Sequence, residues 1–314
     1  MRLEDTGWLR DVLSHLFPAI HIEQVVPTPS SQRVVYFCSF NSYSAIGPGS
    51  ENDSCQDWHK WGEVVLKVSQ DIHPSVIARL EKEIEILNSL DSQYYPKLHH
   101  YDVFGEDQET EEVFPYRLFV TVEERIDGEN LNNCRDQFAG EDSAARLLLQ
   151  LTDALSALWE HGQRIVHRDL KPDNILIRRD RTPVIIDLGI IREEGSAGQT
   201  SSFAQFGPCT PAYASPEQAK NDKKNINFKS DFFALGTIVY ELLTGINPFI
   251  ENQVDPIEEV LQRVISHEPK SLSCLGVASE EFSELVSRLM AKEPYQRFRT
   301  VDILRKSLVS IIEG

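Results

Sequence analysis

The stretch Ile-Val-His-Arg-Asp-Leu-Lys-Pro-Asp-Asn-Ile-Leu-Ile at residues 165–177 places four charged side chains and one amide between two short apolar runs. Short runs rich in β-branched residues are typical of buried strands. A polar loop whose two ends are fixed by strands has a defined shape, and loops of this kind often carry binding or catalytic residues. The stretch therefore predicts a chemically active loop on a rigid support.

The composition excludes some classes of partner. The chain has 314 residues, with 31 Lys and Arg against 49 Asp and Glu, which gives a formal net charge of −18. A strongly acidic protein repels nucleic acid and anionic membrane surfaces. The densest acidic run, at residues 105–112, lies between two apolar stretches and is interpreted as a solvated loop. We expect no nucleic-acid and no membrane partner; no pattern indicates an oligomeric state.

The cysteines and the N-terminus favour a reducing compartment. The five cysteines are scattered, without a Cys-x-x-Cys pair, so neither a zinc site nor a disulfide framework is predicted. No apolar run approaches a membrane span, and Glu4 and Asp5 interrupt any basic-then-apolar leader. We expect a cytoplasmic protein.

Two motifs in this order resemble those of the protein kinases, in particular the bacterial serine/threonine branch. His-Arg-Asp-Leu-Lys-Pro-x-Asn at residues 167–174 resembles the catalytic loop, and Asp-Leu-Gly at residues 187–189 is similar to the metal-binding Asp-Phe-Gly. The resemblance covers about residues 22–312. It implies an α+β fold of two lobes, with a small antiparallel β lobe that carries one main helix and a larger, mostly helical lobe. The expected division is an N-terminal helical extension at 1–21, a small lobe at 22–125 and a large lobe at 126–314.

The resemblance also implies roles for four residues of these motifs. Asp169 would accept the proton of the acceptor hydroxyl, and Lys171 would stabilise the transferring phosphoryl group. Asn174 and Asp187 offer oxygen ligands to Mg²⁺, with Mn²⁺ able to substitute. The implied cofactors are ATP and Mg²⁺.

In the small lobe, a lysine stands alone in an apolar strand. Lys67 in Val-Val-Leu-Lys-Val at residues 64–68 needs an anionic partner. In the helix that follows Pro74, Glu83 falls on the apolar stripe, whereas Glu81 and Glu85 do not. We therefore predict an ion pair between Lys67 and Glu83 that would orient Lys67 toward the ATP phosphates.

The remaining nucleotide contacts follow from the resemblance. Adenine would bind main-chain groups between Glu124 and Ile126, beside an unusual charged residue, Glu123. The residues expected to line the nucleotide pocket are Val35, Val65 and Leu176.

The glycine-rich phosphate loop of the family is not evident, and two placements remain open. In the first, strands at 22–26 and 34–40 form a hairpin, and Thr28, Ser30 and Arg33 occupy the glycine positions. Their side chains would limit how closely the backbone approaches phosphate. In the second, Ile-Gly-Pro-Gly-Ser at 46–50 opens a loop over 46–52 and residues 54–60 form a strand, but they lack alternation. The first placement is preferred, with 41–60 as a surface insertion.

Residues 190–210 have the composition of a flexible activation segment. Arg168 is the family's partner for a phosphate in this segment, and Thr210 would hydrogen-bond toward Asp169 and Lys171. The candidate phosphorylation sites are Thr200, Ser201 and Ser202.

Three residues are expected to support the large lobe. The resemblance implies that Glu217 forms a buried ion pair with Arg297. Asp231, at the start of a buried helix over 230–244, would brace the backbone amides near His167. Near the N-terminus, residues 5–17 predict an amphipathic helix that packs on a neighbouring lobe, with a partner-binding helix as the alternative.

The predicted function is transfer of the ATP γ-phosphoryl group to protein Ser or Thr hydroxyls, including those of its own activation segment. One rival is a pseudokinase or nucleotide-binding scaffold, which the glycine-free phosphate loop favours. Another is a small-molecule kinase of the aminoglycoside type, against which Lys171 and Ser-Pro-Glu at residues 215–217 weigh.

Overall fold

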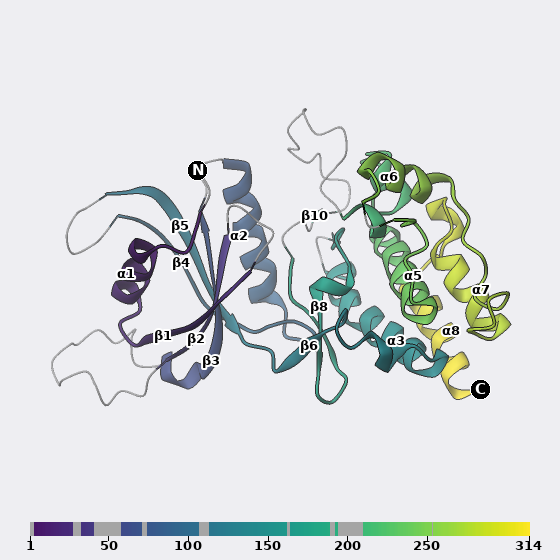
Figure 1. Ribbon diagram of the computed structural model, residues 1–314, viewed down its shortest axis with the longest axis horizontal. Coiled ribbons are helices and arrows are strands. Elements are labelled where there is room, and N and C mark those ends of the chain that lie inside the picture. The colour runs from purple at the N-terminus through teal and green to yellow at the C-terminus, as the bar shows by residue number, and fades with distance from the viewer. Residues whose placement is uncertain are drawn as a thin grey trace. The chain divides into compact units, whose positions relative to one another are not determined.

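The structure is a computed structural model that describes residues 3–27, 33–40, 58–70, 74–106, 113–161, 164–188, 192–193, 210–252 and 254–314. The chain divides into two compact units (Figure 1). The small lobe comprises Met1–Asp91 and Pro96–Ile126, and the large lobe comprises Ser92–Tyr95 and Asp127–Gly314. The expected two-lobed α+β class is confirmed.

The small lobe is built on an antiparallel sheet with the strand order β1-β2-β3-β5-β4 (Figure 1). Successive side chains of a strand point to opposite faces of the sheet, so those of β2 and β3 divide into two sets, one on each face. The strands are β1 (Ile20–Val26), β2 (Arg33–Phe40), β3 (Glu63–Gln70), β4 (Leu98–Glu106) and β5 (Val113–Glu124).

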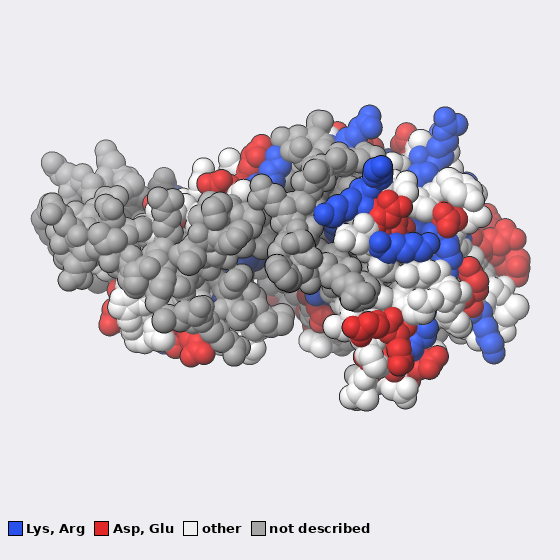
Figure 2. Space-filling model, turned by 90° about the horizontal axis from the view of Figure 1, so that it is seen from above, with Lys and Arg blue, Asp and Glu red and all other residues white. Residues whose placement is uncertain are grey.

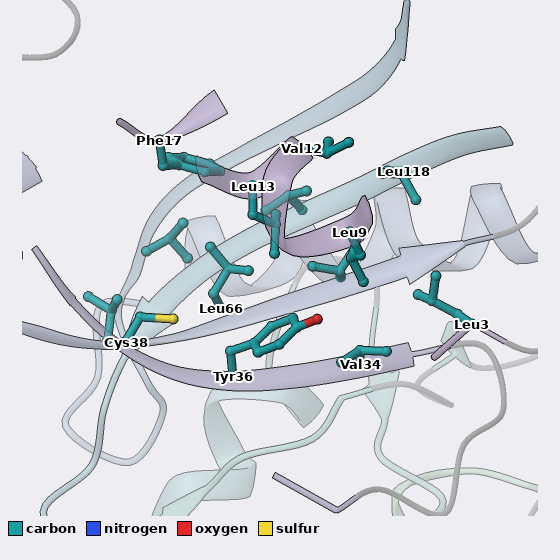
Figure 3. Packing of buried hydrophobic residues seen from close by; sticks show 14 of the residues in the cluster. Leu3, Leu9, Val12, Leu13, Phe17, Val34, Tyr36, Cys38, Leu66 and Leu118 are labelled. Atoms are coloured by element: carbon teal, nitrogen blue, oxygen red, sulfur yellow. The ribbon is translucent and has the colours of Figure 1, made fainter. Parts of the chain in front are cut away.

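One face of this sheet is covered by helix α1 (Gly7–Leu16), which Thr6 caps by accepting a hydrogen bond from the Leu9 amide at 3.2 Å. The apolar side of α1 packs on the side chains of the sheet that alternate with Lys67 (Figure 3). The predicted amphipathic helix thus packs on the sheet of its own lobe. The buried cluster includes Leu9, Val12, Leu13, Phe17, Tyr36, Leu66 and Leu118.

Helix α2 (Pro74–Ser89) lies against the other face of the sheet. Its inward stripe of Leu80, Ile84 and Leu87 is buried, and Glu83 lies on that stripe at 4% exposure. Glu81 and Glu85 are exposed, as their positions off the stripe predict.

The paired strands bear on the two placements of the phosphate loop. β1 and β2 form an antiparallel hairpin whose register runs from Ile20–Phe40 to Val26–Val35, as the first placement requires. The second placement needs residues 54–60 as a strand, and this expectation is wrong at its end, because Trp58–Trp61 is a 3-10 helix. Thr28, Ser30 and residues 46–52 lie outside the described residues.

The large lobe is mostly helical and is organised around helix α5 (Phe228–Thr244), whose residues from Ser230 to Leu243 are all buried. It ends at Thr244, as predicted, and Gly245 follows in the left-handed conformation with φ 76°. α5 packs against α3 and α7, and α8 packs on α3. The other helices are α3 (Glu141–Trp159), α4 (Pro216–Ala219), α6 (Ile257–Ser266), α7 (Glu280–Leu289) and α8 (Val301–Glu313).

Short strands and 3-10 helices complete the large lobe. The strands form two small sheets, one with the order β6-β8-β9 and one pairing β7 with β10. Their bounds are β6 (Gly128–Asn130), β7 (Ile165–Val166), β8 (Ile175–Arg178), β9 (Pro183–Ile185) and β10 (Arg192–Glu193). The 3-10 helices of this lobe are Arg135–Phe138, Pro172–Asn174, Pro211–Tyr213 and Pro294–Gln296.

Charges of both signs lie together on the surface of the large lobe. On the face that Figure 2 shows, lysines and arginines are interspersed with acidic residues over the large lobe. Within the described part of the chain, no helix combines the length and the hydropathy needed to span a bilayer.

The packing of α1 yields a stability prediction. Leu13→Ala removes a fully buried side chain beneath the sheet and should lower the free energy of unfolding by about 2–5 kcal/mol, measured by urea denaturation. Ser14→Ala, on the exposed side of the same helix, is the matched control and should have little effect. Equal losses for the two variants would show that α1 does not pack as described.

Candidate active site

The loop of residues 167–174 is anchored at both ends by short buried strands. β7 precedes it and pairs with β10, whereas β8 follows it and lies between β6 and β9. The two strands that the sequence predicts are therefore present, but each belongs to a different sheet. The loop spans the gap between the two sheets, which limits its freedom.

The carboxylate of Asp231 braces this loop from α5. Its Oδ2 accepts hydrogen bonds from the His167 amide at 2.9 Å and from the Trp159 indole at 2.8 Å, and its Oδ1 accepts one from the Arg168 amide at 2.9 Å. Burial raises the pKa of the Asp231 carboxyl, while His167 and the three hydrogen bonds lower it. The sequence indicates the contact with the amides but not the one with Trp159.

The backbone at Arg168 is strained, with φ 73° in a residue that is not glycine. A conformation of this kind costs about 1–3 kcal/mol and persists only where the surroundings enforce it. Asp231 holds the amide of Arg168, and Gln218 Nε2 donates to its carbonyl at 2.8 Å. Sequence reasoning missed Gln218; its signal is the capping box that it forms with Ser215 at the start of α4.

Asp169, Lys171 and Thr210 form one hydrogen-bonded cluster. Asp169 Oδ1 accepts from the Thr210 amide at 2.9 Å and from its hydroxyl at 2.7 Å. Lys171 Nζ donates to Thr210 Oγ1 at 2.9 Å and lies 3.3 Å from Asp169 Oδ2. Asp169 Oδ2 accepts one longer hydrogen bond, from Asn174 Nδ2 at 3.5 Å, so Oδ1 is the more fully bonded of the two oxygens.

Asn174 and Asp187 supply oxygen atoms in the same lobe. Asn174 is buried, and its Nδ2 donates to the Asp169 carbonyl at 2.9 Å, which directs its Oδ1 away from that carbonyl. The half-buried Asp187 follows β9. An amide oxygen and a carboxylate suit a hard cation such as Mg²⁺. Among the described residues, no cluster of three or more His, Cys, Asp and Glu could hold a metal such as zinc.

The ion pairs of the small lobe differ from the prediction. Lys67 Nζ donates to Glu123 Oε2 at 2.7 Å, and Arg33 Nη2 donates to Glu83 Oε2 at 3.0 Å. Glu83 is turned inward as predicted, but its carboxylate binds Arg33, and the carboxylate 2.7 Å from Lys67 is that of Glu123. The pairing depends on strand register: Arg33 lies opposite Ser69, and Glu123 lies opposite Val65, two residues from Lys67.

Three other residues expected at the nucleotide, Val35, Val65 and Leu176, are half-buried. Val35 lies opposite Lys67 in the β2–β3 register, and Val65 precedes it on the same face. Leu176 is half-buried in β8 of the large lobe. The amide of Glu124 donates to the Lys97 carbonyl at 2.8 Å, so adenine would have to use a later amide, such as that of Ile126.

A buried ion pair anchors the large lobe below the loop. Arg297 Nη1 and Nη2 bind the two carboxylate oxygens of Glu217 at 2.7 and 2.9 Å. Ser230 Oγ donates to the same carboxylate at 2.7 Å, and Arg297 also donates to the Lys229 carbonyl at 2.7 Å. This is the predicted pairing, in a form that satisfies several polar atoms at once. The candidate phosphorylation sites Thr200, Ser201 and Ser202 lie outside the described residues.

The comparison with protein families agrees with this geometry. Residues 41–309 match the model of the protein kinase domain. The match covers most of the chain, so the protein belongs to the protein kinase family. It starts after β2, which leaves the hairpin of β1 and β2 outside it.

Curated proteins give the same assignment. The chain is 30% identical over 244 residues to a probable serine/threonine-protein kinase of Streptomyces coelicolor, covering 77% of this chain and 34% of that protein. It is 31% identical over 254 residues to the serine/threonine-protein kinase PknB of Mycobacterium tuberculosis, covering 80% and 38%. It is 35% identical over 153 residues to PknL of the same species, covering 49% and 37%. The chain thus spans 34–38% of the length of these relatives.

The role of the buried pair of Glu217 and Arg297 can be tested by measuring the stability of variants. Glu217→Gln leaves the Arg297 guanidinium, which is 1% exposed, without a counter-charge, and should lower the free energy of unfolding by about 3–5 kcal/mol. Asp142→Asn breaks the solvent-exposed pair with Arg146 in α3 and should leave unfolding close to that of the wild type. Thermal or urea denaturation compares the two; similar behaviour of both variants would contradict the anchoring role.

Proposed function

We propose that the protein transfers the γ-phosphoryl group of ATP to serine and threonine hydroxyls of a protein substrate. The observation that carries the proposal is the cluster of Asp169, Lys171 and Thr210 in a chain of the protein kinase family. The specificity for Ser and Thr is supported by Lys171, two residues after the loop carboxylate, and by the names of the relatives.

In this proposal, Asp169 orients the acceptor hydroxyl and takes its proton on Oδ2, while Thr210 fixes Oδ1 by two hydrogen bonds. Lys171 places its ammonium group beside Oδ2, where it stabilises negative charge on the transferring group. The protein mainly positions two oxygen atoms in line and neutralises charge, which is what phosphoryl transfer demands.

Mg²⁺ would be held by Asn174 Oδ1 and the Asp187 carboxylate, and when bound it neutralises charge on the phosphate oxygens. Lys67 would bind the nucleotide phosphates, and the Ile126 amide would receive adenine. A phosphate on Thr200, Ser201 or Ser202, placed there by the protein itself, would have the buried Arg168 as its cationic partner.

Labelled ATP tests this proposal. The wild type, incubated with Mg²⁺ and a basic test protein, should transfer label to Ser and Thr. Asp169→Asn should lower kcat about 10²–10⁴-fold and leave nucleotide affinity nearly unchanged, because the variant loses the proton acceptor and keeps the fold. Asp173→Asn is a matched control, because this carboxylate of the same loop is exposed and binds Asn132.

Two outcomes would contradict the proposal. If Asp169→Asn transfers phosphate as fast as the wild type, Asp169 does not have the assigned role. If the wild type binds ATP but transfers no label, the protein is a nucleotide-binding scaffold.

A further inference from the structure

Four charged side chains meet on one face of the small-lobe sheet. Arg33 lies opposite Ser69, and Glu123 lies opposite Val65; both of these partners are two residues from Lys67 in β3. The side chains of Arg33, Lys67 and Glu123 therefore emerge on the same face of the sheet, the face that α2 covers. Glu83 comes from the inward stripe of α2. All four line one pocket of the small lobe, whose apolar wall is formed by Leu80, Ile84, Leu87 and Phe119.

The four charges are sorted into two close pairs. Arg33 Nη2 lies 3.0 Å from Glu83 Oε2, and the two side chains are 20% and 6% exposed. Lys67 Nζ lies 2.7 Å from Glu123 Oε2, and these side chains are 12% and 3% exposed. Each buried carboxylate therefore has a different cation within 3.0 Å, and the pocket is electrically balanced.

Each pair is held by a further side chain of the sheet. Arg33 Nε donates to Ser69 Oγ at 3.1 Å, so its guanidinium bonds β3 through one nitrogen and α2 through another. Thr121 Oγ1 donates to Glu123 Oε1 at 3.0 Å, which leaves Oε2 for Lys67. The planar, forked guanidinium of Arg33 is suited to join two elements in this way, whereas a lysine ammonium has a single nitrogen.

We propose that Arg33 is the positioning residue that holds α2 to the sheet through Glu83, and that Glu123 holds Lys67 independently of that helix. In a kinase that used a pair between Lys67 and Glu83, one lysine would both locate the helix and bind phosphate. Here the two tasks are separated between two cations. Arg33 acts through Glu83 and not on the nucleotide.

The loss of Arg33 would affect both ion pairs of the pocket. Glu83 would remain in the apolar pocket without its cation, a situation that costs several times more than an exposed pair is worth. The other cation that lines the described pocket is Lys67, and drawing it to Glu83 would take it from Glu123. Removing Arg33 therefore disturbs the position of Lys67 without removing any contact to substrate.

Kinetics give the first test, which rests on the proposed function. Arg33→Met should lower kcat about ten- to a hundredfold, because misplacing a catalytic group by about 1 Å has effects of this size, and should raise KM for ATP much less, because Lys67 is displaced and not removed. Arg33→Lys keeps the charge opposite Glu83 but loses the second nitrogen, and should recover only part of the loss. Lys82→Met breaks the pair with Glu85 on the solvent side of α2 and should match the wild type.

Unfolding of the nucleotide-free protein gives the second test, which does not require activity. The shift in thermal midpoint of Arg33→Met combined with Glu83→Gln should be smaller than the sum of the single shifts and no larger than that of Arg33→Met alone, because the second change removes the carboxylate that the first leaves unpaired. Lys67→Met combined with Glu83→Gln should give additive shifts.

The outcomes separate this inference from the proposed function. An increase of KM for ATP of tenfold or more in Arg33→Met, with kcat retained, would identify Arg33 as a phosphate ligand and overturn the inference. Additive shifts for Arg33 and Glu83, with strong coupling of Lys67 to Glu83, would also overturn it. If the wild type transfers no phosphate, the proposed function fails, while the unfolding experiment still decides which cation holds Glu83.

Discussion

The hydrogen bonds accepted by the buried Asp231 carboxylate fix the loop on which the proposed chemistry depends. Burying a carboxylate is costly unless its oxygens are bonded, and here two backbone amides and an indole satisfy them. One of the two amides belongs to Arg168, whose backbone is strained, and the other to the residue before it, so the same bonds stabilise a conformation that the chain would otherwise avoid. Asp231 comes from helix α5, which has almost no polar face because it is buried from Ser230 to Leu243.

In the small lobe, two cations are held in a pocket with an apolar wall. Its sheet is covered on one face by α1, and the charged residues emerge on the other face beside α2. Two cations and two carboxylates balance one another there. Because each carboxylate in this pocket has its own cation, the position of α2 and the position of Lys67 can be set by different contacts.

Much of the large lobe is predictable from the sequence, because its signals are local. The motif of residues 167–174, the glycine at the end of α5 and the apolar spacing of α6, α7 and α8 all act within a few residues of the features they define. The pair of Glu217 and Arg297 joins residues 80 positions apart, and only the family resemblance predicts it.

The small-lobe pairs were not predictable in the same way. The helical stripe shows correctly that Glu83 points inward, but which cation it meets depends on the register of β2 against β3. Arg33 follows a segment without a clear phosphate-loop pattern, so the sequence does not predict that it pairs with Glu83. From the sequence, Glu123 is only an unusual charge, and Gln218 shows only its capping box with Ser215. No local pattern indicates that Gln218 bonds the Arg168 carbonyl or that Trp159 bonds Asp231, because a side chain that bonds a group distant in the sequence leaves no periodicity.

The most direct measurement of the central constraint is hydrogen exchange at the amides of His167 and Arg168 in the wild type and in Asp231→Asn. The amide side chain keeps the volume of Asp231 but offers one acceptor oxygen in place of two. Faster exchange at these two amides, with unchanged exchange in α8, is the expected result. Equal protection of both amides in the two proteins would contradict the view that Asp231 holds the loop.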